Sequence, residues 1–148
     1  MPTNPTNWYC DVCGDQIATA EDGYVIWKVD EQHLDHGFLV VHNGKCDNGQ
    51  YPSSIALPEL VGPDGLSHLM AFLSHGPLRA NPDHPTKPRV ANIDQFVDLV
   101  RRLHVPHYEE ARGHFDNGGV RDAMSDANEY YPYIGKVMQK IAAGEYDD

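Results

Sequence analysis

Three cysteines and one histidine are the residues whose types and spacing could do chemistry. Cys10 and Cys13 form a Cys-x-x-Cys pair, and His42 precedes Cys46 by four positions across Asn43-Gly44, a strong turn signal. Two thiols separated by two residues can bind one tetrahedral ion from a single turn. Three thiolates and one imidazole are a standard closed ligand set for Zn²⁺. The sequence therefore predicts a structural Zn²⁺ site at Cys10, Cys13, His42 and Cys46.

The fourth ligand has rivals, because other donors lie nearby in the sequence. His33, His36 and Asp47 compete with His42, which we favour because it pairs with Cys46 across a turn. With all four positions filled by protein side chains, no coordination position is left for water. That favours a structural ion over a catalytic one.

Two other interpretations of the cysteines remain open. A thioredoxin-like redox pair would place Cys10 at the N-terminus of a helix after a strand, whereas the residues after Gly14 fit a hairpin better. A set of inert buried thiols would not explain a third cysteine at a matching turn. The odd number of cysteines also argues against a disulfide framework.

The residues between the two ligand pairs predict a β-hairpin. Residues 23–29 and 38–41 are rich in β-branched and aromatic side chains, and the polar residues 30–37 separate them. The second strand would carry His42 to Cys10 and Cys13. Metal binding would then close a loop of some thirty residues and stabilise the sheet. This arrangement resembles zinc-ribbon and treble-clef modules over about residues 8–50, a resemblance of architecture that implies no single function.

Helical periodicity dominates the remainder of the chain. We expect helices over residues 63–74, from Asn92, over residues 107–115 and from Pro132. Gln95 would serve as a capping-box partner of Asn92. The apolar stripe of the second helix would contain Ile93, Phe96, Val97, Val100 and Leu103. Residues 76–91 contain four prolines, so we expect them to form an exposed loop without a helix.

These elements together predict an α+β protein. A zinc-stapled hairpin module over residues 1–50 would pack on a small bundle of four to five helices within residues 51–148, with the Pro-rich loop 76–91 in that second part. We expect one compact body, because neither part is large enough to be stable alone.

The charge is strongly acidic, with a net value of −11. Such a surface repels phosphate backbones, so nonspecific nucleic-acid binding is disfavoured. No stretch has the roughly 20 apolar residues of a membrane helix, and the first residues lack the features of a secretory signal. We expect a soluble, cytoplasmic protein without an enzymatic role that recognises or regulates another protein. The polar hairpin tip with Glu31, Leu34 and Asp35 is the predicted contact.

Two alternatives involve the helical part. Residues 92–115 have the pattern of a helix-turn-helix, in which Arg101, Arg102 and Arg112 would have to contact DNA, although Glu109 and Glu110 would face phosphates. The second alternative is a metal-dependent hydrolase with a second metal site on the His-rich helix. Its ligands would be His107, Glu110 and His114.

Overall fold

The computed structural model describes residues 5–47 and 49–148. The chain forms two compact units: Thr6–Val100, and Arg101–Asp148 together with Pro5. Both sheets belong to the first unit, and the fold is α+β, as expected. The predicted boundary at residue 50 lies inside the first unit. The predicted division into residues 1–50 and 51–148, and the expectation that they form one compact body, are not tested here and stay predictions.

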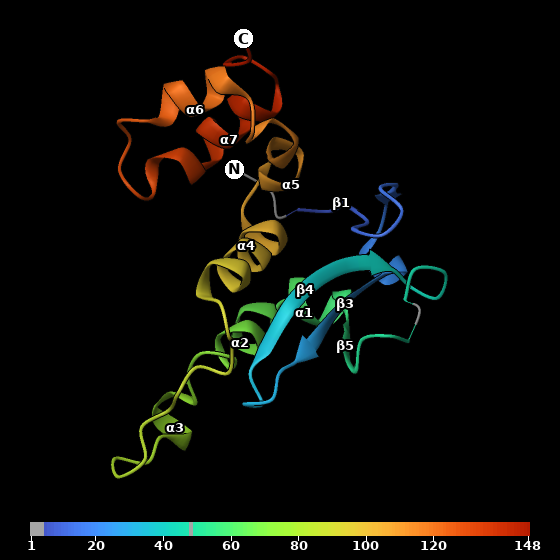
Figure 1. Cartoon of the computed structure of the whole chain (residues 1–148), viewed down its shortest axis with the longest axis vertical. Coiled ribbons are helices and arrows are strands. Elements are labelled where there is room, and N and C mark those ends of the chain that lie inside the picture. The colour runs from blue at the N-terminus through green and yellow to red at the C-terminus, as the bar shows by residue number, and fades with distance from the viewer. Residues whose placement is uncertain (1–4, 48) are drawn as a thin grey trace. The chain divides into compact units, whose positions relative to one another are not determined.

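Two antiparallel sheets make up the β part of the first unit (Figure 1). The smaller sheet is a hairpin of two-residue strands, β1 (Trp8–Tyr9) and β2 (Gln16–Ile17), which places Trp8 opposite Ile17. The larger sheet has the order β4-β3-β5, with strands at Gly23–Val29 (β3), Asp35–His42 (β4) and Ser53–Ala56 (β5). The predicted hairpin of residues 23–42 is therefore confirmed, and its register pairs His42 with Gly23.

Helices cover this sheet through an aromatic core. Trp27 of β3, Phe38 of β4, Phe72 and Phe96 have ring centroids 5.3 to 6.0 Å apart. Phe96 belongs to a helix and Phe72 lies in the turn that follows one, so the cluster joins the sheet to the helical layer. The helices of the first unit are α1 (Leu57–Val61), α2 (Gly65–Met70), α3 (Gly76–Arg79) and the start of α4 (Ile93–His104).

The helix predicted from Asn92 is present as α4, with two corrections. The Asn92 side chain accepts a hydrogen bond from the Gln95 amide (3.2 Å), as a cap should. The Gln95 side chain, however, accepts from the Gly37 amide of β4 (3.2 Å), so no capping box forms. Ile93, expected in the apolar stripe, is 51% exposed.

The Pro-rich segment is an ordered arm rather than a structureless loop. We define the Pro-rich arm as residues 74–89. Its base is closed by a hydrogen bond from the Arg89 amide to the Phe72 carbonyl (2.8 Å) and by one from the His75 amide to Thr86 Oγ1 (3.2 Å). The expectation that residues 76–91 contain no helix is wrong, because Pro77 lies in the first turn of α3, where its missing N–H costs nothing.

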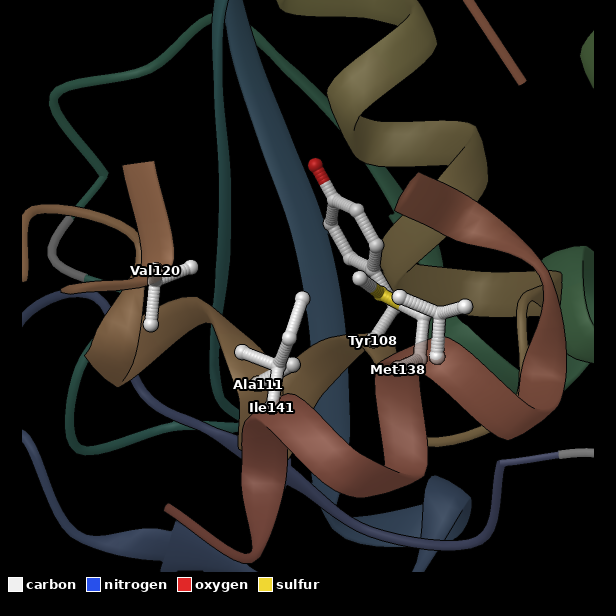
Figure 2. Packing of buried hydrophobic residues seen from close by; sticks show 6 residues of the cluster. Tyr108, Ala111, Val120, Met138 and Ile141 are labelled. Atoms are coloured by element: carbon white, nitrogen blue, oxygen red, sulfur yellow. The ribbon is translucent and has the colours of Figure 1, made fainter. Parts of the chain in front are cut away.

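The second unit is helical, with α5 (Tyr108–Ala111), α6 (Gly118–Met124) and α7 (Gly135–Ala142). Short 3₁₀ segments lie at Arg112–His114 and Tyr131–Tyr133, and a third, at Ala20–Asp22, belongs to the first unit. The described residues thus contain seven short α-helices, where four to five were expected. The core of the unit, shown in Figure 2, is formed by buried residues of α5, α6 and α7: Tyr108, Ala111, Val120, Val137, Met138 and Ile141.

An ion pair lies beside this core. Arg102 and Glu109 are both 3% exposed, and two hydrogen bonds of 2.7 Å join the guanidinium to the carboxylate. Two parallel hydrogen bonds satisfy both charges in a fixed geometry. The pair therefore fixes the end of α4 relative to α5.

Candidate metal centre

Cys10, Cys13, His42 and Cys46 come together at one end of the first unit. Their ligand atoms all lie within 4.8 Å of one another, so the group could hold a metal ion. Cys10 follows β1 directly and Cys13 lies in the turn before β2, whereas His42 is the last residue of β4. The ligands therefore come from both sheets. The three cysteines are free thiols in the structure.

The first turn has the backbone geometry that a Cys-x-x-Cys ligand pair needs. The Gly14 amide donates to the Cys10 carbonyl (2.9 Å), and the Cys10 amide donates to the Asp15 carbonyl (2.9 Å). Gly14 has a φ of +79°, a conformation that glycine adopts without strain. The Val12 amide points at Cys10 Sγ (3.4 Å). Cys10 thus stands between two strands and not at a helix N-terminus, unlike the cysteine of a thioredoxin-like redox pair.

Asp11 fastens this turn to the larger sheet. Its amide donates to the Val40 carbonyl (2.8 Å), and its carboxylate accepts from the Val40 amide (2.8 Å). Val40 lies two residues before His42 on β4. The clamp therefore sets the distance between the thiol turn and the strand that carries the imidazole.

His42 is oriented by both of its ring nitrogens. Nδ1 lies 3.3 Å from Cys13 Sγ and 3.7 Å from Cys46 Sγ, while Nε2 lies 3.0 Å from the Gln16 carbonyl oxygen. A carbonyl can only accept, so this hydrogen bond assigns the proton to Nε2. The Nδ1 lone pair then faces the sulfurs, which is the arrangement by which an outer carbonyl orients a metal-binding imidazole.

The spacing of the donor atoms fits a tetrahedral ion. Zn–S and Zn–N bonds of about 2.3 and 2.0 to 2.1 Å place tetrahedral ligand atoms about 3.5 to 3.8 Å apart. The two distances from His42 Nδ1 to sulfur, 3.3 and 3.7 Å, are close to that range. Four protein donors fill a tetrahedral shell completely. Soft thiolates with one imidazole suit Zn²⁺ and other soft or borderline metal ions rather than Mg²⁺ or Ca²⁺.

The ionisation of the three thiols also favours a bound cation. Burial raises the pKa of the Cys10 thiol, but hydrogen bonds from the backbone and from His42 outweigh it and lower that pKa to about 6. At Cys46, burial raises the pKa, and hydrogen bonds and charge repulsion from Cys10 and Cys13 raise it further, to about 11. Three thiolates at this spacing repel one another, and a bound divalent ion removes that conflict.

The other metal ligands that the sequence suggested do not join a cluster. His33, His36 and Asp47 are not part of the group at His42. Across residues 5–47 and 49–148, no second group of three metal-binding side chains occurs, so His107, Glu110 and His114 are not brought together. The His114 imidazole instead pairs with the Asp147 carboxylate (2.8 Å).

The arginines of the helix-turn-helix alternative are engaged inside the second unit. Arg102 is buried against Glu109, and Arg112 lies 3.5 Å from the same carboxylate. The Arg101 guanidinium stacks 3.9 Å from the centroid of the Tyr133 ring. Glu109, expected to face phosphates, is buried instead. The side chains that would have to contact DNA therefore have intramolecular partners.

The predicted contact at the hairpin tip needs a correction at Asp35. Glu31 is exposed and Leu34 is half-buried, but Asp35 is only 8% exposed. Its amide donates to the Arg89 carbonyl, and its carbonyl accepts from the Ala91 amide (2.9 Å). Asp35, the first residue of β4, is therefore paired with the end of the Pro-rich arm. The sequence pattern missed this burial because the partner lies more than fifty residues away. The Asp30 side chain closes the tip by accepting from the amides of residues 32 and 34.

Two residues that support the site were not identified from the sequence. The roles of Asp11 and Gln16 depend on a carboxylate–backbone clamp and on a backbone carbonyl. A carbonyl carries no residue-type signal, so only Asp11, between the two thiols, offered a clue.

Among the residues that the structure describes, no helix combines the length and the apolar character that crossing a lipid bilayer demands. Comparison of the chain with protein-family models, curated proteins and solved structures found no match.

Proposed function

We propose that this chain is a zinc-binding protein whose Cys₃His site is structural, and that it acts by recognising another protein. The observation that carries the metal assignment is His42, whose Nδ1 faces the sulfurs while Nε2 is held by the Gln16 carbonyl. Four protein ligands leave no position for a substrate or a water molecule, which supports a structural ion.

A structural ion has a clear task in this unit. The two-residue strands β1 and β2 are too short to be stable as a separate hairpin. Ligands from the β1–β2 turn and from the end of β4 would let one ion cross-link the two sheets. Metal binding free energy would then become folding free energy of the first unit.

Protein recognition is the functional part of the proposal. The net charge of −11 favours a basic partner over a phosphate backbone. The hairpin tip supports this choice, because Glu31 is exposed on a turn that the Asp30 side chain holds in one conformation. A rigid, charged tip can meet a basic partner without a large ordering cost.

Metal analysis of the purified protein tests the zinc assignment. We expect about one zinc per chain, and Cys13→Ser should abolish binding because serine cannot replace a thiolate ligand. Substituted Co²⁺ should show the visible absorption of a tetrahedral thiolate site. Cys13 is exposed, so the variant removes a ligand without opening the core. A folded, reduced sample that contains almost no metal and takes up no Co²⁺ would end the proposal.

A further inference from the structure

An apolar groove lies between α2 and α4 in the first unit. Its walls are the leucines and Met70 of the α2 segment on one side and Phe96, Val97 and Val100 of α4 on the other, and it encloses about 150 Å³. The side chains at its mouth are unusually exposed for apolar residues: Leu66 is 48% and Met70 58% exposed. Exposed apolar side chains gathered around one groove make this face a candidate interaction site.

A second apolar feature projects from the same unit. Leu78 of α3 is 95% exposed, on the Pro-rich arm whose base is closed by the hydrogen bonds of Arg89 and His75. A single exposed leucine needs no explanation by itself. Here, however, the leucine stands on a segment that the fold holds in place, which lowers the entropy lost on docking.

The groove and the arm also carry opposite charges. The arm contains three Lys or Arg residues against one Asp, on a chain whose net charge is −11. Arg89 at its base already pairs with Asp35 (3.7 Å), so Arg79 and Lys87 carry the positive charge that the arm can offer a partner. Asp64 immediately precedes α2, and Asp94 lies in the first turn of α4, so carboxylates stand at the helix ends that border the groove. Such complementarity favours docking of the arm on this face and selects its orientation.

We propose that Leu78 of one copy of this chain inserts into the α2–α4 groove of a second copy, and that the exchange is reciprocal. An apolar cavity of about 150 Å³ holds a molecule of the size of benzene, and the four-carbon side chain of leucine is smaller. Arm and groove belong to the same compact unit, so each copy can offer both, as the reciprocal contact of a two-fold symmetric dimer requires.

Sedimentation velocity of the full-length, zinc-loaded chain tests this, over about 10 µM to 1 mM protein. We expect a dimer whose population rises with concentration and falls with added salt. Leu78→Asp and Met70→Asp should each raise the dissociation constant of the dimer at least about tenfold. Both copies carry the substitution, so each of the two apolar contacts then buries a carboxylate. Tyr130→Asp is the matched control, because it alters a 68% exposed aromatic residue of the other unit and should change nothing.

Mixing the two defective variants gives the sharpest result. The Leu78→Asp chain keeps an intact groove and the Met70→Asp chain keeps an intact arm, so a mixed dimer regains one of the two contacts. We expect an equimolar mixture to dimerise more strongly than either variant alone. A wild-type chain that stays monomeric at the highest concentration, or a mixture with no such gain, overturns the proposal. So does a Leu78→Asp dimer as stable as the wild type, because another occupant then covers the groove.

Discussion

The proposed metal assignment depends most on a single residue, His42. Its imidazole is held between the Gln16 carbonyl and two sulfurs, and this fixes both the tautomer and the direction of the lone pair. His36, six residues earlier on the same strand β4, has no place in the cluster. The two histidines therefore make a matched pair for testing the ligand set.

We expect His42→Ala to weaken zinc binding by at least about 100-fold, because one of four ligands and its outer hydrogen bond are lost together. His36→Ala should leave the affinity unchanged. Competition with a chromophoric chelator measures both values. Equal loss in the two variants would mean that the imidazole contributes only to folding of β4, and His42 would not be the fourth ligand.

The Arg102–Glu109 pair gives a second prediction at the residue scale. Because both groups are buried, Glu109→Ala should lower the free energy of unfolding by about 3 to 5 kcal/mol, since it removes the carboxylate that pairs with the buried Arg102 guanidinium. Arg102→Met should destabilise by a similar amount. The double variant should lose clearly less than the sum, and urea unfolding of the four proteins measures the coupling. Additive losses would show that the two side chains act independently.

Residue types alone could predict the donors but not their surroundings. The spacing of Cys10, Cys13, His42 and Cys46 was sufficient to name the set that the structure gathers. Burial of Asp35 and Arg102 could not be predicted, because each depends on a partner brought in by the chain's later course. A charged residue in a polar segment gives no sign of such a partner.

At the scale of elements, long periodic segments were predictable and short ones were not. The strands of residues 23–42 and the helix α4 have clear patterns, and both are present. The strands β1 and β2 have two residues each, which is too short for any periodicity. The helix α6 begins at Gly118-Gly119, a poor helix start that the Asn117 side chain caps by accepting from two amides.

Metal removal should therefore affect elements unequally. We expect strong chelation to increase amide hydrogen exchange at β1, β2 and the end of β4, because the ion would cross-link these strands. Amides of α7 should keep their protection, since Val137, Met138 and Ile141 are buried in a core of their own. Exchange measured by mass spectrometry resolves these segments. Unchanged exchange around residues 8–17 after complete metal removal would contradict a cross-linking role.

For the whole molecule, charge is the property that the sequence already defined. The net charge of −11 creates a negative electrostatic potential around the protein, which attracts basic partners. Salt screens this potential over roughly one Debye length, about 8 Å at physiological ionic strength. Fields of this kind act mainly on the rate of association, whereas close contacts determine the rate of release. The position of the charge then matters as much as its sum.

The final prediction uses that distinction to test the hairpin tip. Once a basic partner has been cross-linked to the zinc-loaded chain and identified, Glu31→Lys should slow its association by about two- to tenfold at low salt, because the reversed charge opposes steering. Glu59→Lys, an exposed residue of α1, changes the net charge equally at another place and should have a smaller effect. Stopped-flow measurements at rising salt should show the two rates converging as screening shortens the field. If Glu31→Lys and Glu59→Lys slow association equally, only the total charge matters and the tip does not contact the partner.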